Sequence, residues 1–133
     1  MALTKVSGDG LNSAAISTVN SEGGAVTTSV VQGLCKVWIN FNASGTIATR
    51  DSLNVSSITD EAQGYFQYDF TNAMNNSDYS GSGNAGEGNN NNNRNIQFGD
   101  TYSTTALDVN CGDGVGSAVD PSVLCSQIVG DLA

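Results

Sequence analysis

An alternation of apolar and polar side chains over residues 35–42, Cys-Lys-Val-Trp-Ile-Asn-Phe-Asn, broken only by Trp38, constrains the fold of this chain more than any other feature. Successive side chains of a β-strand point to opposite faces of a sheet. The alternation therefore places Val37, Ile39 and Phe41 on a buried face, with Trp38 among polar residues on the other. A half-buried strand, rather than a helix, is expected here.

Short strand-like segments separated by turn residues continue along the chain. Asn, Ser, Thr and Gly dominate the composition and recur in clusters about every eight to twelve positions, which is typical of antiparallel sandwiches and barrels. In residues 65–70, Phe66, Tyr68 and Phe70 share one face. The expected strands are residues 26–31, 35–42, 46–50, 53–59, 65–70, 96–98, 102–109 and 123–129. The sequence thus predicts an all-β, antiparallel β-sandwich that is jelly-roll-like.

The first 24 residues differ from the rest of the chain. Their apolar residues, among them Leu3, Val6 and Leu11, are too sparse to build a core. Gly23-Gly24 marks a boundary, since adjacent glycines favour turns and loops. We expect residues 1–24 to be an extended N-terminal docking arm and residues 25–133 to be the sandwich domain.

Charge excludes several classes of partner. The net charge is −9, and the only bases are Lys5, Lys36, Arg50 and Arg94. Four scattered cations cannot neutralise a nucleic-acid backbone or dock on anionic lipid. The N-terminus lacks the apolar core of a secretory signal, and no segment is apolar over a membrane-spanning length. Synthesis in a cytoplasm, with no nucleic-acid or membrane partner, is therefore expected.

The three cysteines, Cys35, Cys111 and Cys125, are an odd number without C-x-x-C spacing. In a reducing compartment the expected state is the buried free thiol. A bridge between Cys111 and Cys125 is the alternative, if oxidation follows release from the cell.

A metal or cofactor site is not indicated. The segment Asp108-Val-Asn-Cys-Gly-Asp113-Gly is rich in oxygen ligands, but it lacks the ligand order of a calcium loop and no Glu closes it. An ordinary turn is the preferred interpretation, and no cofactor is expected.

Catalysis is also not indicated. The chain has no histidine, the usual general base. The carboxylate pairs Asp60/Glu61 and Asp51/Asp69 could in principle hydrolyse a glycoside, but no aromatic subsites bracket them. We therefore expect a non-enzymatic protein that presents a surface.

Residues 81–95, Gly-Ser-Gly-Asn-Ala-Gly-Glu-Gly followed by an Asn-rich run, predict a long exposed loop, because Gly and Asn favour turn conformations and bury no apolar area. Such a loop either has no partner or forms a binding surface. Asn amides both donate and accept hydrogen bonds, which suits glycan hydroxyls. The residues that would form this contact are Tyr79, Asn89, Asn90, Asn91 and Arg94.

Several segments carry a more specific signal. They are the strand motif at 35–42, Arg-Asp-Ser-Leu-Asn-Val-Ser-Ser-Ile-Thr-Asp at 50–60, Gly-Tyr-Phe-Gln-Tyr-Asp-Phe-Thr-Asn-Ala-Met at 64–74, Asp78-Tyr79, Asp-Thr-Tyr-Ser-Thr-Thr at 100–105, Pro-Ser-Val-Leu-Cys at 121–125 and Leu-Thr-Lys-Val-Ser-Gly-Asp-Gly at 3–10. Together they resemble the start and the C-terminal β-domain of tail-fibre proteins of marine and cyanobacterial phages. The long shaft of such fibres is missing here, and the Asn-rich insertion at 84–93 departs from the family pattern.

The resemblance implies a virion protein, made in the bacterial host and assembled as a homotrimer. The arm, with Leu3, Val6 and Leu11, would dock on other virion proteins, and the sandwich would point outward as a short fibre or spike that contacts a host glycan or protein. From its place on the strand at 35–42, Trp38 would be either a subunit contact or the anchor of a second layer. The alternative is a capsid decoration, cement or head-fibre protein without a receptor role.

Overall fold

The computed structural model describes residues 18–20, 27–29, 33–87 and 94–133, and the chain divides into two compact units, Met1–Leu34 and Cys35–Ala133. In the first unit, β1 (Thr18–Asn20) pairs antiparallel with β2 (Thr27–Ser29). The division between the units falls after Leu34, whereas the sequence suggested one at Gly23-Gly24. The expected docking residues Leu3, Val6 and Leu11 lie outside the described residues.

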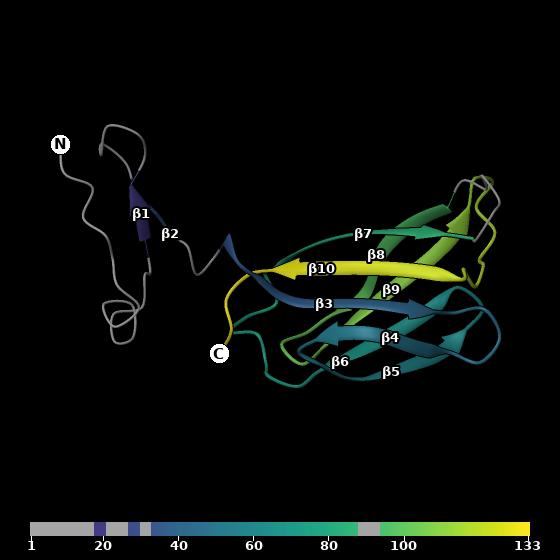
Figure 1. Ribbon diagram of the computed structural model, residues 1–133, viewed down its shortest axis with the longest axis horizontal. Helices are drawn as coiled ribbons and strands as arrows, with labels where there is room; N and C mark the ends of the chain where they lie inside the picture. The colour runs from purple at the N-terminus through teal and green to yellow at the C-terminus, as the bar shows by residue number, and fades with distance from the viewer. Residues whose placement is uncertain (1–17, 21–26, 30–32, 88–93) are drawn as a thin grey trace. The chain divides into compact units, whose positions relative to one another are not determined.

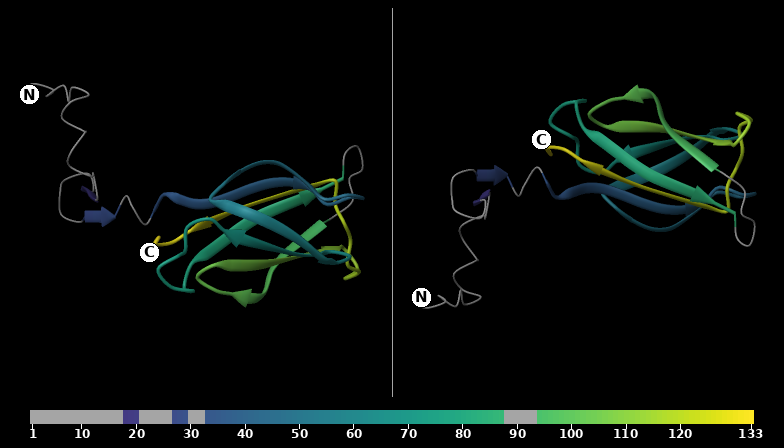
Figure 2. Two further views of the ribbon diagram at one scale, coloured as in Figure 1. Left: turned by 90° about the horizontal axis from the view of Figure 1, so that it is seen from below. Right: turned by 90° about the horizontal axis from the view of Figure 1, so that it is seen from above.

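The second unit is a sandwich of two four-stranded antiparallel sheets, so the all-β sandwich prediction is confirmed (Figures 1 and 2). One sheet, here the β3 sheet, has the order β4-β3-β10-β7, and the other, the β6 sheet, has the order β5-β6-β9-β8. The strands are β3 (Cys35–Asn42), β4 (Ala48–Leu53), β5 (Val55–Ala62), β6 (Tyr65–Phe70), β7 (Ser80–Gly86), β8 (Arg94–Tyr102), β9 (Ala106–Asp113) and β10 (Val123–Val129). The first and last strands of this unit, β3 and β10, are central neighbours (Figure 1).

The predicted faces of β3 and β6 are confirmed. Val37, Ile39 and Phe41 are each at most 1% exposed, and Phe66, Tyr68 and Phe70 are buried as well. The Phe41 ring meets Phe66 and Tyr68 edge-on, with ring centroids 5.4 and 6.0 Å apart. Because the two strands belong to different sheets, these aromatic contacts join the two layers.

Lys36 is a buried charged residue. It lies on the outward side of β3 but is only 7% exposed. A lysine stem can cover apolar surface while its ammonium group reaches water, which explains how a charged residue occupies such a place.

The sequence predicted the ends of β4 and β5 only approximately. Asn54, with φ of 60°, separates β4 from β5, where the sequence suggested strands at 46–50 and 53–59. Asp60 and Glu61 belong to β5 rather than to a turn. The turn that follows uses Gly64, with φ of 75°, and the Asp120 side chain accepts a 2.6 Å hydrogen bond from its N–H.

The expected long loop over residues 81–95 is wrong for its first part. Residues 80–86 form β7, which pairs with β10 along its whole length. Gly81 and Gly83 face inward, where a Cβ would lie 3.0 Å from the Phe98 ring and 2.6 Å from the Cys125 carbonyl oxygen, respectively. Glycine is therefore required in this strand by the close approach of its neighbours, and does not mark a loop.

Candidate functional site

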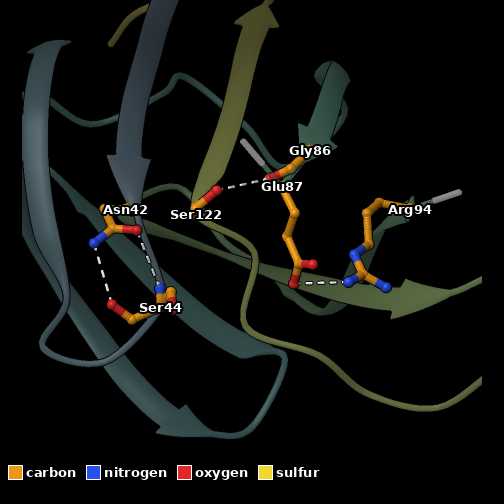
Figure 3. Close-up of polar contacts among 6 residues, drawn as sticks. All are labelled: Asn42, Ser44, Gly86, Glu87, Arg94 and Ser122. Carbon is orange, nitrogen blue, oxygen red and sulfur yellow. Dashed lines mark hydrogen bonds and ion pairs between the residues drawn. The ribbon is translucent and has the colours of Figure 1, made fainter. Parts of the chain in front are cut away.

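Arg94, expected on the receptor surface, is engaged within the fold (Figure 3). Its Nη2 lies 2.7 Å from Glu87 Oε1, and its side chain is only 8% exposed. Because Glu87 follows β7 and Arg94 begins β8, this ion pair bridges the ends of strands in different sheets. The guanidinium is thus committed to the sandwich and presents little surface to a ligand.

Nearby hydrogen bonds fix the same end of the sandwich. The Ser122 hydroxyl donates to the Gly86 carbonyl oxygen at 3.4 Å, and Asn42 exchanges hydrogen bonds with the Ser44 backbone (Figure 3). The first contact joins the β9–β10 connection to the end of β7, and the second lies within the β3–β4 connection. They account for local order without a ligand.

Tyr79 is a core residue, so the expectation that it flanks the Asn-rich loop and stacks on a glycan is wrong. It is 7% exposed, and its hydroxyl donates toward the backbone carbonyl oxygens of Ser103 (3.0 Å) and Ala106 (3.2 Å). It precedes β7, whereas the Asn-rich run follows that strand. Its ring stacks on Tyr102 at 5.1 Å, and burial raises its pKa to about 12. Asn89, Asn90 and Asn91 lie outside the described residues, so their role stays a prediction.

The carboxylates considered for catalysis are not brought together. Asp51 lies on the outer face of the β3 sheet opposite Asn40, whereas Asp69 lies on the outer face of the β6 sheet and accepts a 2.6 Å hydrogen bond from Ser57. Asp60 and Glu61 are consecutive exposed residues of β5, at the bulge where its register with β6 shifts. The Asp51/Asp69 pair lacks the facing geometry that glycoside hydrolysis requires.

The calcium-loop candidate is mostly strand, because β9 extends through Asp113. Asp113 Oδ1 accepts hydrogen bonds from the backbone N–H groups of Val115 (3.0 Å) and Ser117 (2.8 Å), which lower the pKa of its carboxyl group. Asp113 therefore organises a turn. Among residues 33–87 and 94–133 and the two short strands, no group of three His, Cys, Asp or Glu side chains is placed to hold a metal.

All three cysteines are free thiols. Cys111 is 2% exposed within the core, and burial raises its pKa. Cys125 is partly exposed on the outer face of the β3 sheet.

No helix in the described part of the chain could span a membrane.

An open hollow of about 540 Å³ lies on the outer face of the β3 sheet, and sequence reasoning missed it except for Trp38. Its outward-facing side chains come from β3, β10 and β7. They are Trp38, Asn40, Ser82, Asn84, Cys125 and Gln127. A smaller hollow of about 130 Å³ lies on the β6 sheet, beside Tyr65 and Asn110.

Comparisons with known proteins give no assignment. No protein-family model matches the chain, and no significant match was found among curated proteins or solved structures.

Proposed function

We propose that this chain is a non-enzymatic structural protein of a phage virion, a short tail-fibre or spike-like protein exposed on the particle. The observation that carries the proposal is where the fibre-like motif falls in the fold. Residues 35–60, which resemble phage tail-fibre modules, form the β3–β4 hairpin and most of β5, and so contribute strands to both sheets. The separated carboxylates support a presenting role over a catalytic one.

The division of the chain into two units supports separate roles in attachment to the particle and in surface exposure. In this proposal the N-terminal unit docks on other virion proteins, and the sandwich faces outward toward a host surface. The chain assembles as a homotrimer, as the resemblance implies, because closed rotational symmetry lets small domains bury surface on one another. Light scattering after size-exclusion chromatography tests the assembly; a stable monomer at micromolar concentration would contradict the trimer.

Location on the particle is the decisive test of the proposed function. Purified virions labelled with an antibody against residues 35–133 should show label on a tail or on a surface projection by electron microscopy. Label distributed over the head would favour a capsid decoration or head-fibre protein instead. Absence of the protein from purified virions would overturn the virion assignment.

A further inference from the structure

The outer faces of the two sheets differ in how their polar side chains are satisfied. On the β6 sheet, Gln67 donates to Asp108 at 2.9 Å, and Ser57 donates to Asp69 at 2.6 Å. On the β3 sheet, the side chains that surround the 540 Å³ hollow make few such contacts. The side chains of Ser82, Asn84 and Gln127 and the Trp38 indole N–H have no hydrogen-bond partner among the residues that the structure describes.

Strand register arranges these groups in two rows. Gln127 pairs with Trp38 on one side and with Ser82 on the other. In the next outward row, Cys125 pairs with Asn40 and with Asn84. Neighbouring side chains are about 5 Å apart across strands and about 7 Å apart along a strand. An indole and several amides therefore converge on a patch comparable in size to one or two pyranose rings.

Asn40 is held in one orientation. Arg50 Nη1 donates to Asn40 Oδ1 at 3.1 Å, and the same guanidinium donates to the backbone oxygens of Phe41 (3.0 Å) and Ser122 (2.6 Å). Because arginine only donates, the Asn40 oxygen must face Arg50 and its NH₂ group is left for another acceptor. This preorganisation lowers the entropy cost of binding a ligand.

The charge around the hollow narrows the ligand class. The side chains that line it are uncharged. The charged residues beside it are Lys36 on β3, two residues before Trp38, and the oppositely charged neighbours Arg50 and Asp51 on β4. The chain as a whole carries a net charge of −9, which disfavours a polyanionic ligand. A neutral ligand with one apolar face and many hydroxyl groups matches this lining.

We infer that this hollow is a binding site for a neutral carbohydrate. The apolar C–H face of a sugar ring stacks on Trp38, and its hydroxyls exchange hydrogen bonds with Asn40, Asn84 and Gln127. The volume falls within the roughly 300–1,000 Å³ of small-molecule sites. The inference deepens the proposed function by naming the ligand class. It rests on the proposed function only for the source of the glycan, the host surface.

The experiment uses the full chain and two independent readouts. The protein is applied to an array of neutral oligosaccharides built from glucose, galactose, mannose and N-acetylglucosamine, with sialylated and phosphorylated oligosaccharides beside them. Bound sugars are then titrated in solution. Trp38 is the sole tryptophan, so a change in its emission reports directly on the hollow. Alkylation of Cys125 should slow when the sugar is bound, while alkylation of Cys35 should not change.

Variants locate the site. Trp38→Ala should weaken binding roughly tenfold or more, and Asn84→Ala and Gln127→Ala should each weaken it about three- to tenfold. Tyr65→Ala is the matched control, because Tyr65 is an aromatic residue 45% exposed on the β6 sheet. This control should bind as the parent does, and thermal melts establish that each variant is folded.

Three results would overturn the inference. They are no binding to any neutral oligosaccharide at millimolar concentration, binding of sialylated or phosphorylated oligosaccharides alone, and an affinity for the neutral sugar that is unchanged in Trp38→Ala. A fourth is a loss of trimer mass in Trp38→Ala, since the hollow would then be the subunit contact that the sequence suggested. All of these are measured on isolated protein, so they are independent of where the chain lies on a virion.

Discussion

At the scale of the residue, the core depends on a few aromatic side chains, some from one sheet and some from the other, that contact each other between the layers. Phe41 is fully buried and contacts Phe66 and Tyr68 edge-on. Phe41→Ala should lower the free energy of unfolding by about 3–5 kcal/mol, through lost transfer energy and the cavity that remains. Thr49→Ala, at an exposed position paired with Phe41, is the control and should change stability by less than about 0.5 kcal/mol. Equal effects in chemical denaturation would contradict the inward placement of Phe41.

A buried hydroxyl pair gives the core a pH dependence. Ser126 Oγ donates to the Tyr68 hydroxyl at 3.0 Å, and burial raises the pKa of Tyr68, as it raises that of Tyr79 to about 12. The folded state therefore holds these protons above pH 10, where the unfolded chain releases them. The contribution of these two tyrosines to stability should be constant up to about pH 10 and should fall as the pH rises beyond it.

Denaturation series at pH 8 to 12 measure this effect. Tyr68→Phe should flatten the decline above pH 10, because the ionisable group is removed. Tyr65→Phe is the control, since Tyr65 is exposed and contributes no such burial. A decline above pH 10 that is unchanged in Tyr68→Phe would contradict the assignment to Tyr68.

At the scale of the element, β7 shows a strand built without large side chains. Its inward positions are Gly81, Gly83 and Ala85, and the Ile96 and Phe98 side chains of β8 occupy the space that larger residues would need. Gly83→Val should destabilise the sandwich by about 1–3 kcal/mol or more, since its Cβ would meet the Cys125 carbonyl oxygen at 2.6 Å. Gly86→Val is the control, because nothing lies within 4 Å of a Cβ there. Similar melting temperatures for the two variants would contradict the close packing at Gly83.

The same strand explains what the sequence could predict about the fold. Alternation identified β3 and β6, because large apolar residues such as Phe41 and Tyr68 mark the buried face. It missed β7, because Gly, Ser and Asn are depleted in strands and carry no periodic signal. The position of Asn54 at the β4–β5 corner was also missed, since a left-handed backbone angle depends on tertiary context.

At the scale of the whole molecule, the candidate site arises from strands distant in sequence. Trp38 stood out from the sequence, but its neighbours Gln127 and Ser82 are set by the order β3-β10-β7, which no local pattern encodes. The prediction for Tyr79 and Arg94 failed for the opposite reason. Both were expected on a loop surface because they lie close to the Asn-rich run in the sequence. The structure places them in the core and in an ion pair.

The division into two units leads to the last prediction. Both sheets and the core clusters lie wholly within Cys35–Ala133, and the pairing of β3 with β10 joins the ends of this unit. Residues 35–133 should therefore fold without residues 1–34, with a melting temperature within about 4 °C of the full chain, equivalent to about 1 kcal/mol. In cells that make only the truncated protein, the virions should not incorporate it, because the proposed docking segment is missing. Aggregation or a much lower melting temperature would show that residues 1–34 complete the core, and normal copy number on particles would place docking in the sandwich instead.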